Sequence, residues 1–240
     1  MPYRLRRTPL AQAVYQASLD SLRYIKRRHN YRGLSAILGI SPSTLSRYLS
    51  GKTLPSSRRA LTLLEKLDTL MKYDEIVEEF FGGELDIENG IQICHDTDVI
   101  KVLSAHILRQ FVGSKIDSVL AVDLHAIPMA AYFASLINSE VYFTTDRPVW
   151  RASLEITYRS DGGNVKNSIW VPRNLIRRGR SILLIATSVL SHSPHREIFN
   201  LIRDKRAYAT GLFTLVSRRS VWTTLSVTPG CKKVVVKLYT

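Results

Sequence analysis

The sequence of 240 residues is poor in cysteine and carries none of the common glycine-rich phosphate loops. Its two cysteines, Cys94 and Cys231, are far apart, which argues against a disulfide framework and against a structural zinc site. The patterns Gly-x-x-x-x-Gly-Lys and Gly-x-Gly-x-x-Gly are missing, as are a nucleophile triad and His or Cys residues at metal-ligand spacing. We therefore expect no metal site and no bound cofactor.

Long apolar runs are missing as well. The most apolar stretch, Leu120–Ile137, contains Asp123, His125 and Pro128, whereas a membrane-spanning helix needs about 20 residues with few such breaks. The segment 9–19 is too polar for the core of a signal peptide. These features predict a soluble, cytoplasmic protein that does not contact a membrane.

Acidic residues are scarce and unevenly distributed. The chain has 20 Asp and Glu residues against 34 Lys and Arg, a formal net charge of +14. Residues 1–73 carry 14 basic and 3 acidic groups, whereas residues 74–240 carry 20 and 17. This distribution indicates a polyanion-binding module joined to a nearly neutral body. The hydrophobic content of 45% supports a folded core and excludes a disordered basic tail.

The basic segment has the pattern of two short helices joined by a tight turn. The first helix fits Leu34–Leu38, and Gly39 provides the left-handed backbone that the turn needs. Ser41 is a good N-cap for a second helix that begins at Pro42 and ends near Leu49. Another helix, which starts near Leu10, is expected before this pair, and one more is expected after it, at about 57–72.

The second helix of this pair exposes hydroxyl groups and a guanidinium group that can reach base edges and phosphates in a major groove. Basic residues on both sides of it can neutralise backbone phosphates, as can Arg4, Arg6 and Arg7. The candidate DNA-binding residues are Ser43, Thr44, Ser46, Arg47, Lys52, Arg58 and Arg59.

The pattern over about residues 32–70 resembles the helix-turn-helix family of phage-repressor and Cro type. The resemblance implies double-stranded DNA as a partner. One alternative is a helical interaction module whose basic residues are only solvated. RNA binding is a second alternative, although a recognition helix suits the wide major groove of B-DNA better than the narrow groove of RNA.

Beyond residue 72 the pattern changes to alternating strands and helices. An acidic run begins at Asp74 and is followed by Gly82 and Gly83. This pattern predicts a linker or connecting helix over 73–90, between a first domain at 1–72 and a second at 91–240. Strand–helix–strand alternation implies a mostly parallel sheet covered by helices. The expected elements are helices at 97–111, 128–137 and 195–206, strands at 118–122, 140–144, 181–186 and 210–217, and a hairpin pairing 153–158 with 168–171 around Asp161-Gly162-Gly163-Asn164.

The predicted fold class is thus α/β, with an N-terminal all-α domain and a larger sheet domain. The stretch Asp117–Ala134 and the stretch Arg180–Glu197 resemble, in order, the core unit and the phosphoribosyl-pyrophosphate signature of type I phosphoribosyltransferases. The resemblance covers roughly residues 95–220. It implies a ligand site at the carboxyl ends of the strands, with these candidate residues: Asp123, His125, Ala126, Arg147, Thr187, Ser188, Ser191, His192, Ser193 and His195.

The departures from the family pattern decide the expected chemistry. Where the family has two acidic residues that grip the ribose, this chain has the neutral Thr187 and Ser188, so the charge-assisted bonds and the main electrostatic contribution to catalysis are lost. The phosphate loop becomes Ser191–His195, whose hydroxyls and imidazoles can meet an anion at a helix start, although Pro194 lacks an N–H. We expect no catalysis.

The resemblances together favour a transcriptional regulator similar in plan to the purine-operon repressors. Its sheet domain is expected to form a homodimer and to sense an anionic ligand, either nucleotide-like or a short oligonucleotide. One alternative is an active phosphoribosyltransferase with an autoregulatory DNA-binding domain. The others are a nucleic-acid-binding structural protein without a sensor role and, for the sheet domain, a purely structural dimerisation role.

Overall fold

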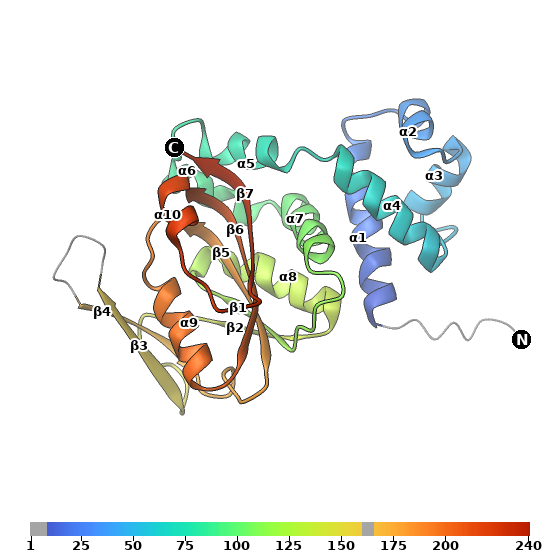
Figure 1. The fold of residues 1–240 in the computed structure, drawn as a ribbon. Coiled ribbons are helices and arrows are strands. Elements are labelled where there is room, and N and C mark those ends of the chain that lie inside the picture. Colours follow the sequence, from blue (N-terminus) through green and yellow to red (C-terminus); the bar gives the residue numbers. More distant parts are fainter. Residues whose placement is uncertain (1–8, 160–165) are drawn as a thin grey trace, which may run out of the picture.

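The chain forms a helical part and a sheet part that lie side by side (Figure 1). The computed structural model describes residues 9–159 and 166–240. Arg4, Arg6, Arg7 and the hairpin loop 161–164 lie outside the described residues. The helices are α1 (Pro9–Lys26), α2 (Tyr31–Leu38), α3 (Pro42–Leu49), α4 (Ser57–Leu70), α5 (Tyr73–Phe81), α6 (Ile87–Gly90), α7 (Thr97–Gln110), α8 (Ile127–Ile137), α9 (His195–Asp204) and α10 (Arg219–Thr224), with 3-10 turns η1 (Ile91–His95) and η2 (Leu124–Ala126).

The α2–turn–α3 unit forms through the local signals that the sequence contains. Gly39 closes α2 with φ 69° and ψ 30°, and its N–H donates to the Ser35 carbonyl. The Ser41 hydroxyl accepts from the Thr44 N–H at 3.3 Å, with Pro42 in the first turn of α3. Both predictions are confirmed. The Lys66 Nζ atom of α4 donates to the Leu38 carbonyl at 2.8 Å and so fastens the end of α2 to α4.

The main sheet has the strand order β2-β1-β5-β6-β7, and every neighbouring pair in it is parallel. A separate antiparallel hairpin joins β3 to β4. The strands are β1 (Ser118–Ala121), β2 (Glu140–Phe143), β3 (Ser153–Arg159), β4 (Lys166–Pro172), β5 (Ser181–Val189), β6 (Tyr208–Arg218) and β7 (Lys232–Tyr239). The predicted mixed fold with a mostly parallel sheet is confirmed.

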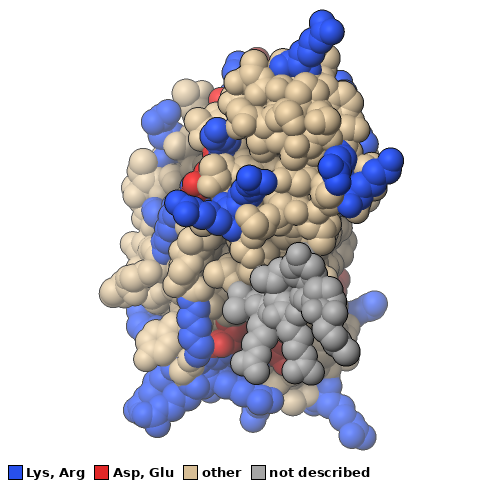
Figure 2. All heavy atoms as spheres, turned by 90° about the vertical axis from the view of Figure 1, so that its right-hand side faces the viewer, with Lys and Arg blue, Asp and Glu red and all other residues tan. Residues whose placement is uncertain are grey.

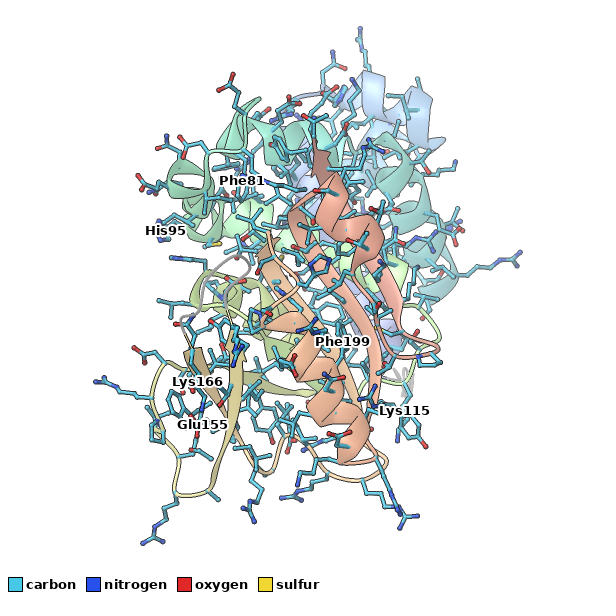
Figure 3. The ribbon with its side chains drawn as sticks, turned by 60° about the vertical axis from the view of Figure 1, so that its left-hand side comes forward. Phe81, His95, Lys115, Glu155, Lys166 and Phe199 are labelled. Atoms are coloured by element: carbon cyan, nitrogen blue, oxygen red, sulfur yellow. The ribbon has the colours of Figure 1, made fainter. Side chains whose placement is uncertain are left out.

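Alternating side chains of the strands supply two cores, one on each face of the sheet. Leu183 and Ile185 of β5 pack with α7 and α8. Ile182 and Leu184 of the same strand pack with α9 and the hairpin. Phe199 of α9 lies against this second face, beside the hairpin that carries Glu155 and Lys166 (Figure 3).

The end of β5 and the presence of α10 and β7 differ from the predicted pattern. β5 continues to Val189, because β6 is long enough to pair with Ser188 and Val189, so Thr187 and Ser188 lie inside the strand rather than after it. α10 and β7 have no predicted counterpart; in β7, lysines flank a short apolar centre.

Within the described residues no helix has the length and apolar character to cross a membrane.

A single core joins the two parts of the molecule. α1 packs against α4 on one side and against α7 and α8 on the other, and its buried residues belong to the same cluster as those of α7 and β6. The segment 73–90 also packs: Ile76, Val77 and Phe81 of α5 are buried, and Lys237 of β7 pairs with Glu78 at 2.8 Å. The helical part is therefore held against the sheet part by packing.

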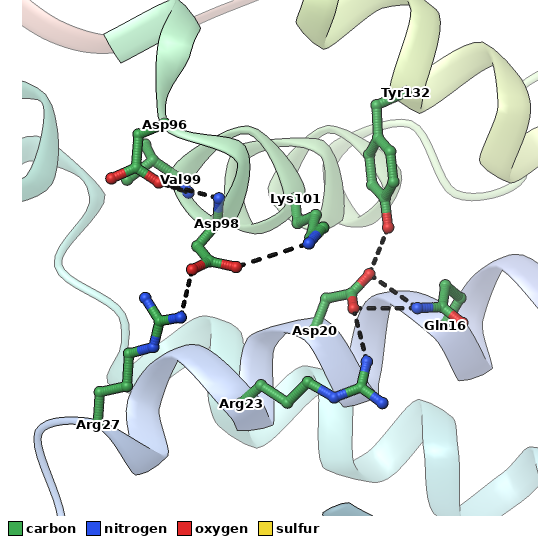
Figure 4. A network of polar contacts seen from close by, with 9 residues as sticks. All are labelled: Gln16, Asp20, Arg23, Arg27, Asp96, Asp98, Val99, Lys101 and Tyr132. Carbon is green, nitrogen blue, oxygen red and sulfur yellow. Dashed lines mark hydrogen bonds and ion pairs between the residues drawn. The ribbon is translucent and has the colours of Figure 1, made fainter. Parts of the chain in front are cut away.

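A buried carboxylate lies in this junction (Figure 4). Asp20 of α1 is 4% exposed and accepts hydrogen bonds from Gln16 Nε2 at 3.0 and 3.1 Å and from Arg23 Nη1 at 3.2 Å. The hydroxyl of Tyr132, on α8, donates to the same carboxylate. A buried charge without hydrogen-bond partners is costly, so the Asp20 carboxylate favours the position of α8 in which Tyr132 reaches it. This contact therefore links α8 to α1.

Further polar contacts cross the junction. Arg27 pairs with Asp98 of α7 at 2.5 Å (Figure 4). Asp68 of α4 accepts from His106 of α7 at 3.0 Å and from the Tyr73 hydroxyl at 2.8 Å. Burial opposes ionisation of Asp68, but the hydrogen bonds from His106 and Tyr73 outweigh it and lower the pKa of this carboxyl.

Candidate functional site

The helix α3 presents one polar face to solvent and one apolar face to the core. Ser43, Ser46 and Arg47 are exposed, at the spacing that places them on one side of a helix. Leu45 and Tyr48 are buried, 0% and 4% exposed, and anchor the opposite side. Ser43, Ser46 and Arg47 thus lie on the solvent side, as the recognition-helix prediction requires, while Leu45 and Tyr48 hold the opposite side on the core.

Thr44 differs from its neighbours. It is half-buried, and its hydroxyl lies 2.8 Å from that of Ser41. The structure thus places Thr44 at the start of α3, engaged with the N-cap, while Ser43 also contacts the Ser41 hydroxyl at 3.1 Å. The hydroxyls form a small cluster at this helix end.

Basic residues surround the exposed face of α3. Lys52, Arg58 and Arg59 are all exposed. The two arginines and Lys66 line a cleft of about 520 Å³ between α2, α3 and α4. Figure 2 shows that Lys and Arg side chains are spread over this end of the molecule, with few acidic ones among them. A basic rim around a polar helix face attracts phosphates on both sides of the helix.

The second group of predicted residues lies at the carboxyl ends of β1 and β5, where the structure brings three of them into contact. The Asp123 carboxylate accepts from the Thr187 N–H at 2.7 Å, from the Thr187 hydroxyl at 2.9 Å and from the Ala126 N–H at 2.9 Å. Burial raises the pKa of Asp123, against the opposing effect of these hydrogen bonds. Asp123 and Thr187 thus satisfy each other inside the protein.

The loop after β5 is also internally bonded. The Ser191 hydroxyl donates to the Ser193 carbonyl. The N–H of Arg196 donates to the His192 carbonyl at 2.9 Å, and the N–H of Glu197 donates to the Pro194 carbonyl at 3.0 Å. Two N–H groups at the start of α9 that could face an anion are thereby occupied within the loop.

The remaining predicted ligand residues are more dispersed. His192 contacts the Thr224 hydroxyl of α10 through Nε2, at 2.8 Å. His125 and Ser188 are half-buried. Arg147 is exposed in the segment after β2, and its carbonyl accepts from the Thr145 hydroxyl at 2.7 Å.

Two contacts at this edge come from residues that the sequence analysis did not select. Cys94 of η1 lies 4.0 Å from the Thr187 hydroxyl, and burial raises the pKa of its thiol to about 11. Thr224 of α10 is the partner of His192. Both lie far from the loop in sequence, so no local pattern points to them. Within the described residues no three His, Cys, Asp or Glu side chains are grouped to hold a metal ion.

His195 is 5% exposed at the first turn of α9, and neither ring nitrogen has a hydrogen-bond partner within the described structure. Burial disfavours the charged imidazolium and, against the smaller opposing effect of the nearby Ser191 backbone, lowers the pKa of His195 to about 4. The ring therefore packs as a neutral group under the loop, with Ser193 beside it in the chain also buried.

The comparisons with known proteins agree with the division into two parts. Residues 23–72 match the helix-turn-helix family, a range that covers α2, α3 and α4. No curated protein matches the chain in sequence. The chain therefore carries a helix-turn-helix domain.

The fold of the rest is similar to that of adenine phosphoribosyltransferases of known structure. The enzyme from Thermoanaerobacter pseudethanolicus aligns with a TM-score of 0.54 at 12% identity, over 65% of this chain and 87% of that one. The enzyme from Leishmania donovani aligns with a TM-score of 0.55 at 9% identity, over 69% and 80%. The enzyme from Giardia lamblia, complexed with 9-deazaadenine, aligns with a TM-score of 0.54 at 9% identity, over 63% of this chain and 85% of that one. At these identities the likeness establishes a phosphoribosyltransferase-like fold.

The buried imidazole generates a prediction about stability and pH. Unfolded His195 takes up a proton near pH 6.5, whereas folded His195 does so only near pH 4. Between these values the unfolded state binds more protons, so His195 lowers the free energy of unfolding by about 1.4 kcal/mol for each unit that the pH falls. Urea titrations of His195→Leu should show a flatter pH dependence than wild type over this interval.

The exposed His29 provides the control, since His29→Gln also removes one imidazole. This variant should keep the wild-type dependence. A His195→Leu protein that loses as much stability as wild type between these pH values would contradict the burial of a neutral ring.

Proposed function

We propose that this protein is a cytoplasmic, sequence-specific DNA-binding transcriptional regulator whose phosphoribosyltransferase-like part forms a homodimer and senses an anionic, nucleotide-like ligand without catalysing a reaction. The observation that carries the proposal is the exposed polar face of α3, with Ser43, Ser46 and Arg47, inside a matched helix-turn-helix domain. An α-helix of this kind fits the major groove, where side chains distinguish base pairs.

The residues at the carboxyl ends of β1 and β5 support the absence of catalysis. Thr187 and Ser188 are neutral and lie within β5. The carboxylate of Asp123 accepts three hydrogen bonds from within the protein, which leaves it poorly placed to stabilise a cationic transition state. The similarity to adenine phosphoribosyltransferases favours the alternative, an active enzyme that also binds DNA, and this alternative is tested below.

The sensor role is supported by the loop from Ser191 to His195. The Ser191 hydroxyl and the His192 imidazole are polar groups before the start of α9, at the edge where ligands of parallel sheets bind. An anion that displaced the internal bonds of Ser191 and His192 would also release Thr224 of α10. Binding would then alter the sheet part, on which α1 packs. Allosteric coupling would follow if the ligand bound two arrangements of the sheet part with different affinity.

The homodimer is supported by apolar side chains that are exposed near the carboxyl ends of β1 and β2. Leu124 is 71% exposed, Val149 53% and Val141 40%. Phe143, which contacts the Trp150 ring at 5.5 Å, lies among them. Exposed apolar side chains on neighbouring segments favour an association surface here. A dimer would present two copies of α3 to a palindromic or near-palindromic site.

The DNA-binding proposal predicts different effects for two substitutions. Arg47→Ala should weaken binding to the specific site by about 1–3 kcal/mol, because Arg47 would read a base. Lys52→Ala should weaken binding to all duplexes alike and reduce the salt dependence, because Lys52 would contact a phosphate. Fluorescence anisotropy with selected genomic fragments and scrambled duplexes, at several salt concentrations, measures both effects.

Lys115→Ala is the control, because it removes an exposed charge between α7 and β1, outside the helix-turn-helix domain; this variant should bind DNA as wild type does. If neither Arg47→Ala nor Lys52→Ala changes binding, α3 is not the recognition helix.

The dimer proposal predicts that charge on the apolar surface separates the subunits. Leu124→Glu/Val149→Glu should elute as a monomer in size exclusion with light scattering, because both side chains are more than half exposed and their replacement leaves the core intact. Leu54→Glu, at an exposed position of the helix-turn-helix domain, should remain dimeric. A wild-type monomer, or a double variant that stays dimeric, would contradict this assignment.

The non-catalytic proposal predicts no product from phosphoribosyl pyrophosphate, magnesium and a panel of purine and pyrimidine bases. Chromatography of the reaction mixtures should show unchanged substrate. Nucleotide formation that is lost in Thr187→Ala or Ser188→Ala would instead establish the enzyme.

The sensor proposal predicts that phosphoribosyl pyrophosphate raises the melting temperature of the protein, because a ligand that binds the folded state stabilises it. Ser191→Ala/His192→Ala should lose most of this increase. Arg173→Gln, which removes a cation at the opposite ends of the strands, should keep it. Equal melting shifts in all three proteins would place the ligand elsewhere.

A further inference from the structure

A second basic region lies at the amino ends of the strands, opposite the edge just described. Residues 173–206 carry eight basic and two acidic groups, whereas the remainder of 74–240 carries twelve and fifteen. The excess positive charge of the sheet part is therefore concentrated in this segment. Figure 3 shows nitrogen-tipped side chains projecting from this lower end of the molecule, below α9.

The centre of this region is concave. A cleft of about 480 Å³ lies between the segment before β5, the end of α9 and the start of β6. It is lined by Arg178, Arg203 and Arg206 from separate segments, with Tyr208 and Thr228. The volume is within the range of small-molecule sites. Positive charge in a concave surface focuses the field on an incoming anion.

Helix capping does not account for these arginines. The last carbonyls of α9 already accept from the backbone: Leu201 from Lys205 at 3.1 Å, Ile202 from Ala207 at 3.0 Å, and Arg203 from Arg206 at 2.9 Å. The guanidinium groups are therefore not needed to satisfy the end of the helix.

Internal ion pairing does not account for them either. Within the described residues Arg178 and Arg206 form no ion pair, and Arg203 contacts Asn200 at 2.9 Å and Asp204 at 3.7 Å. The backbone holds two of the segments together, since the Gly179 N–H donates to the Arg206 carbonyl at 2.8 Å. The fold thus brings Arg178 and Arg206, which have no acidic partner within the described residues, to the same cleft.

One further feature points to the kind of ligand. The Tyr208 ring is 64% exposed at the edge of the cleft, where it offers an aromatic face.

We propose that this cleft is a second ligand site, which binds a nucleotide unit with its phosphate on Arg178, Arg203 and Arg206 and its base stacked on Tyr208. Guanidinium groups bind phosphate in forked, charge-assisted pairs, and aromatic rings stack on any base. The unit comes from a free nucleotide or from a single-stranded nucleic acid, which share this chemistry. The site lies at the opposite ends of the strands from the sensor loop and does not depend on the sensor function.

The test is calorimetric titration of the full chain with AMP, with Ser191→Ala/His192→Ala as the background so that the sensor loop does not contribute. Adding Arg178→Gln/Arg206→Gln should weaken AMP binding about tenfold or more. The matched control, Arg173→Gln/Arg177→Gln, removes the same charge from exposed neighbours that do not line the cleft and should change binding less than about twofold. Equal affinities in the two double variants would overturn the site.

The variant Tyr208→Leu distinguishes the contact with the base from the contact with the phosphate. It should weaken the binding of AMP and leave the binding of ribose 5-phosphate unchanged. Unchanged AMP binding would overturn the assignment of a nucleotide. Competition identifies the source of the nucleotide unit. If an oligothymidylate of twelve nucleotides displaces AMP, and Arg178→Gln/Arg206→Gln weakens binding of this oligonucleotide, the site binds a single strand. If AMP stays bound in the presence of the oligonucleotide, the site binds a free nucleotide.

Discussion

The packing of α1 between the helix-turn-helix and the sheet is the constraint on which the rest of the structure depends. One face of α1 closes the helical core against α4, and the other packs on α7 and α8. Asp20 reinforces this position, because a carboxylate that is 4% exposed needs every one of its partners, and Tyr132 comes from the other part of the molecule. The helix-turn-helix is thus held in a fixed position on the sheet part by packing.

Charge is separated along the molecule in a way that the total of +14 conceals. The helix-turn-helix end is basic around α3. The amino ends of β5 and β6 form a second basic region, and the remainder of the sheet part is slightly acidic. Because salt screens charge beyond about 8 Å at physiological ionic strength, the local distribution of charge matters more to a nearby anion than the net charge of the chain.

The carboxyl ends of β1 and β5 show why local sequence was an incomplete guide to the ligand edge. Asp123 and Thr187 are 64 residues apart, yet they form two hydrogen bonds with each other. The loop at Ser191 occupies its own backbone donors. The resemblance to the phosphoribosyltransferase pattern predicts that Thr187 and Ser188 stand where the family has two acidic residues. It does not reveal that the Asp123 carboxylate accepts two hydrogen bonds from Thr187.

The sequence by itself determined the elements that depend on neighbouring residues. The turn at Gly39, the cap at Ser41 and the strand–helix alternation follow from backbone preference and short-range periodicity, and each is present. Only the tertiary structure decided where β5 ends, because β6 supplies the partners of Ser188 and Val189. It also decided that β7 joins the sheet and that Arg178 and Arg206 share one cleft. These outcomes depend on pairing and packing between distant segments, which no local pattern encodes.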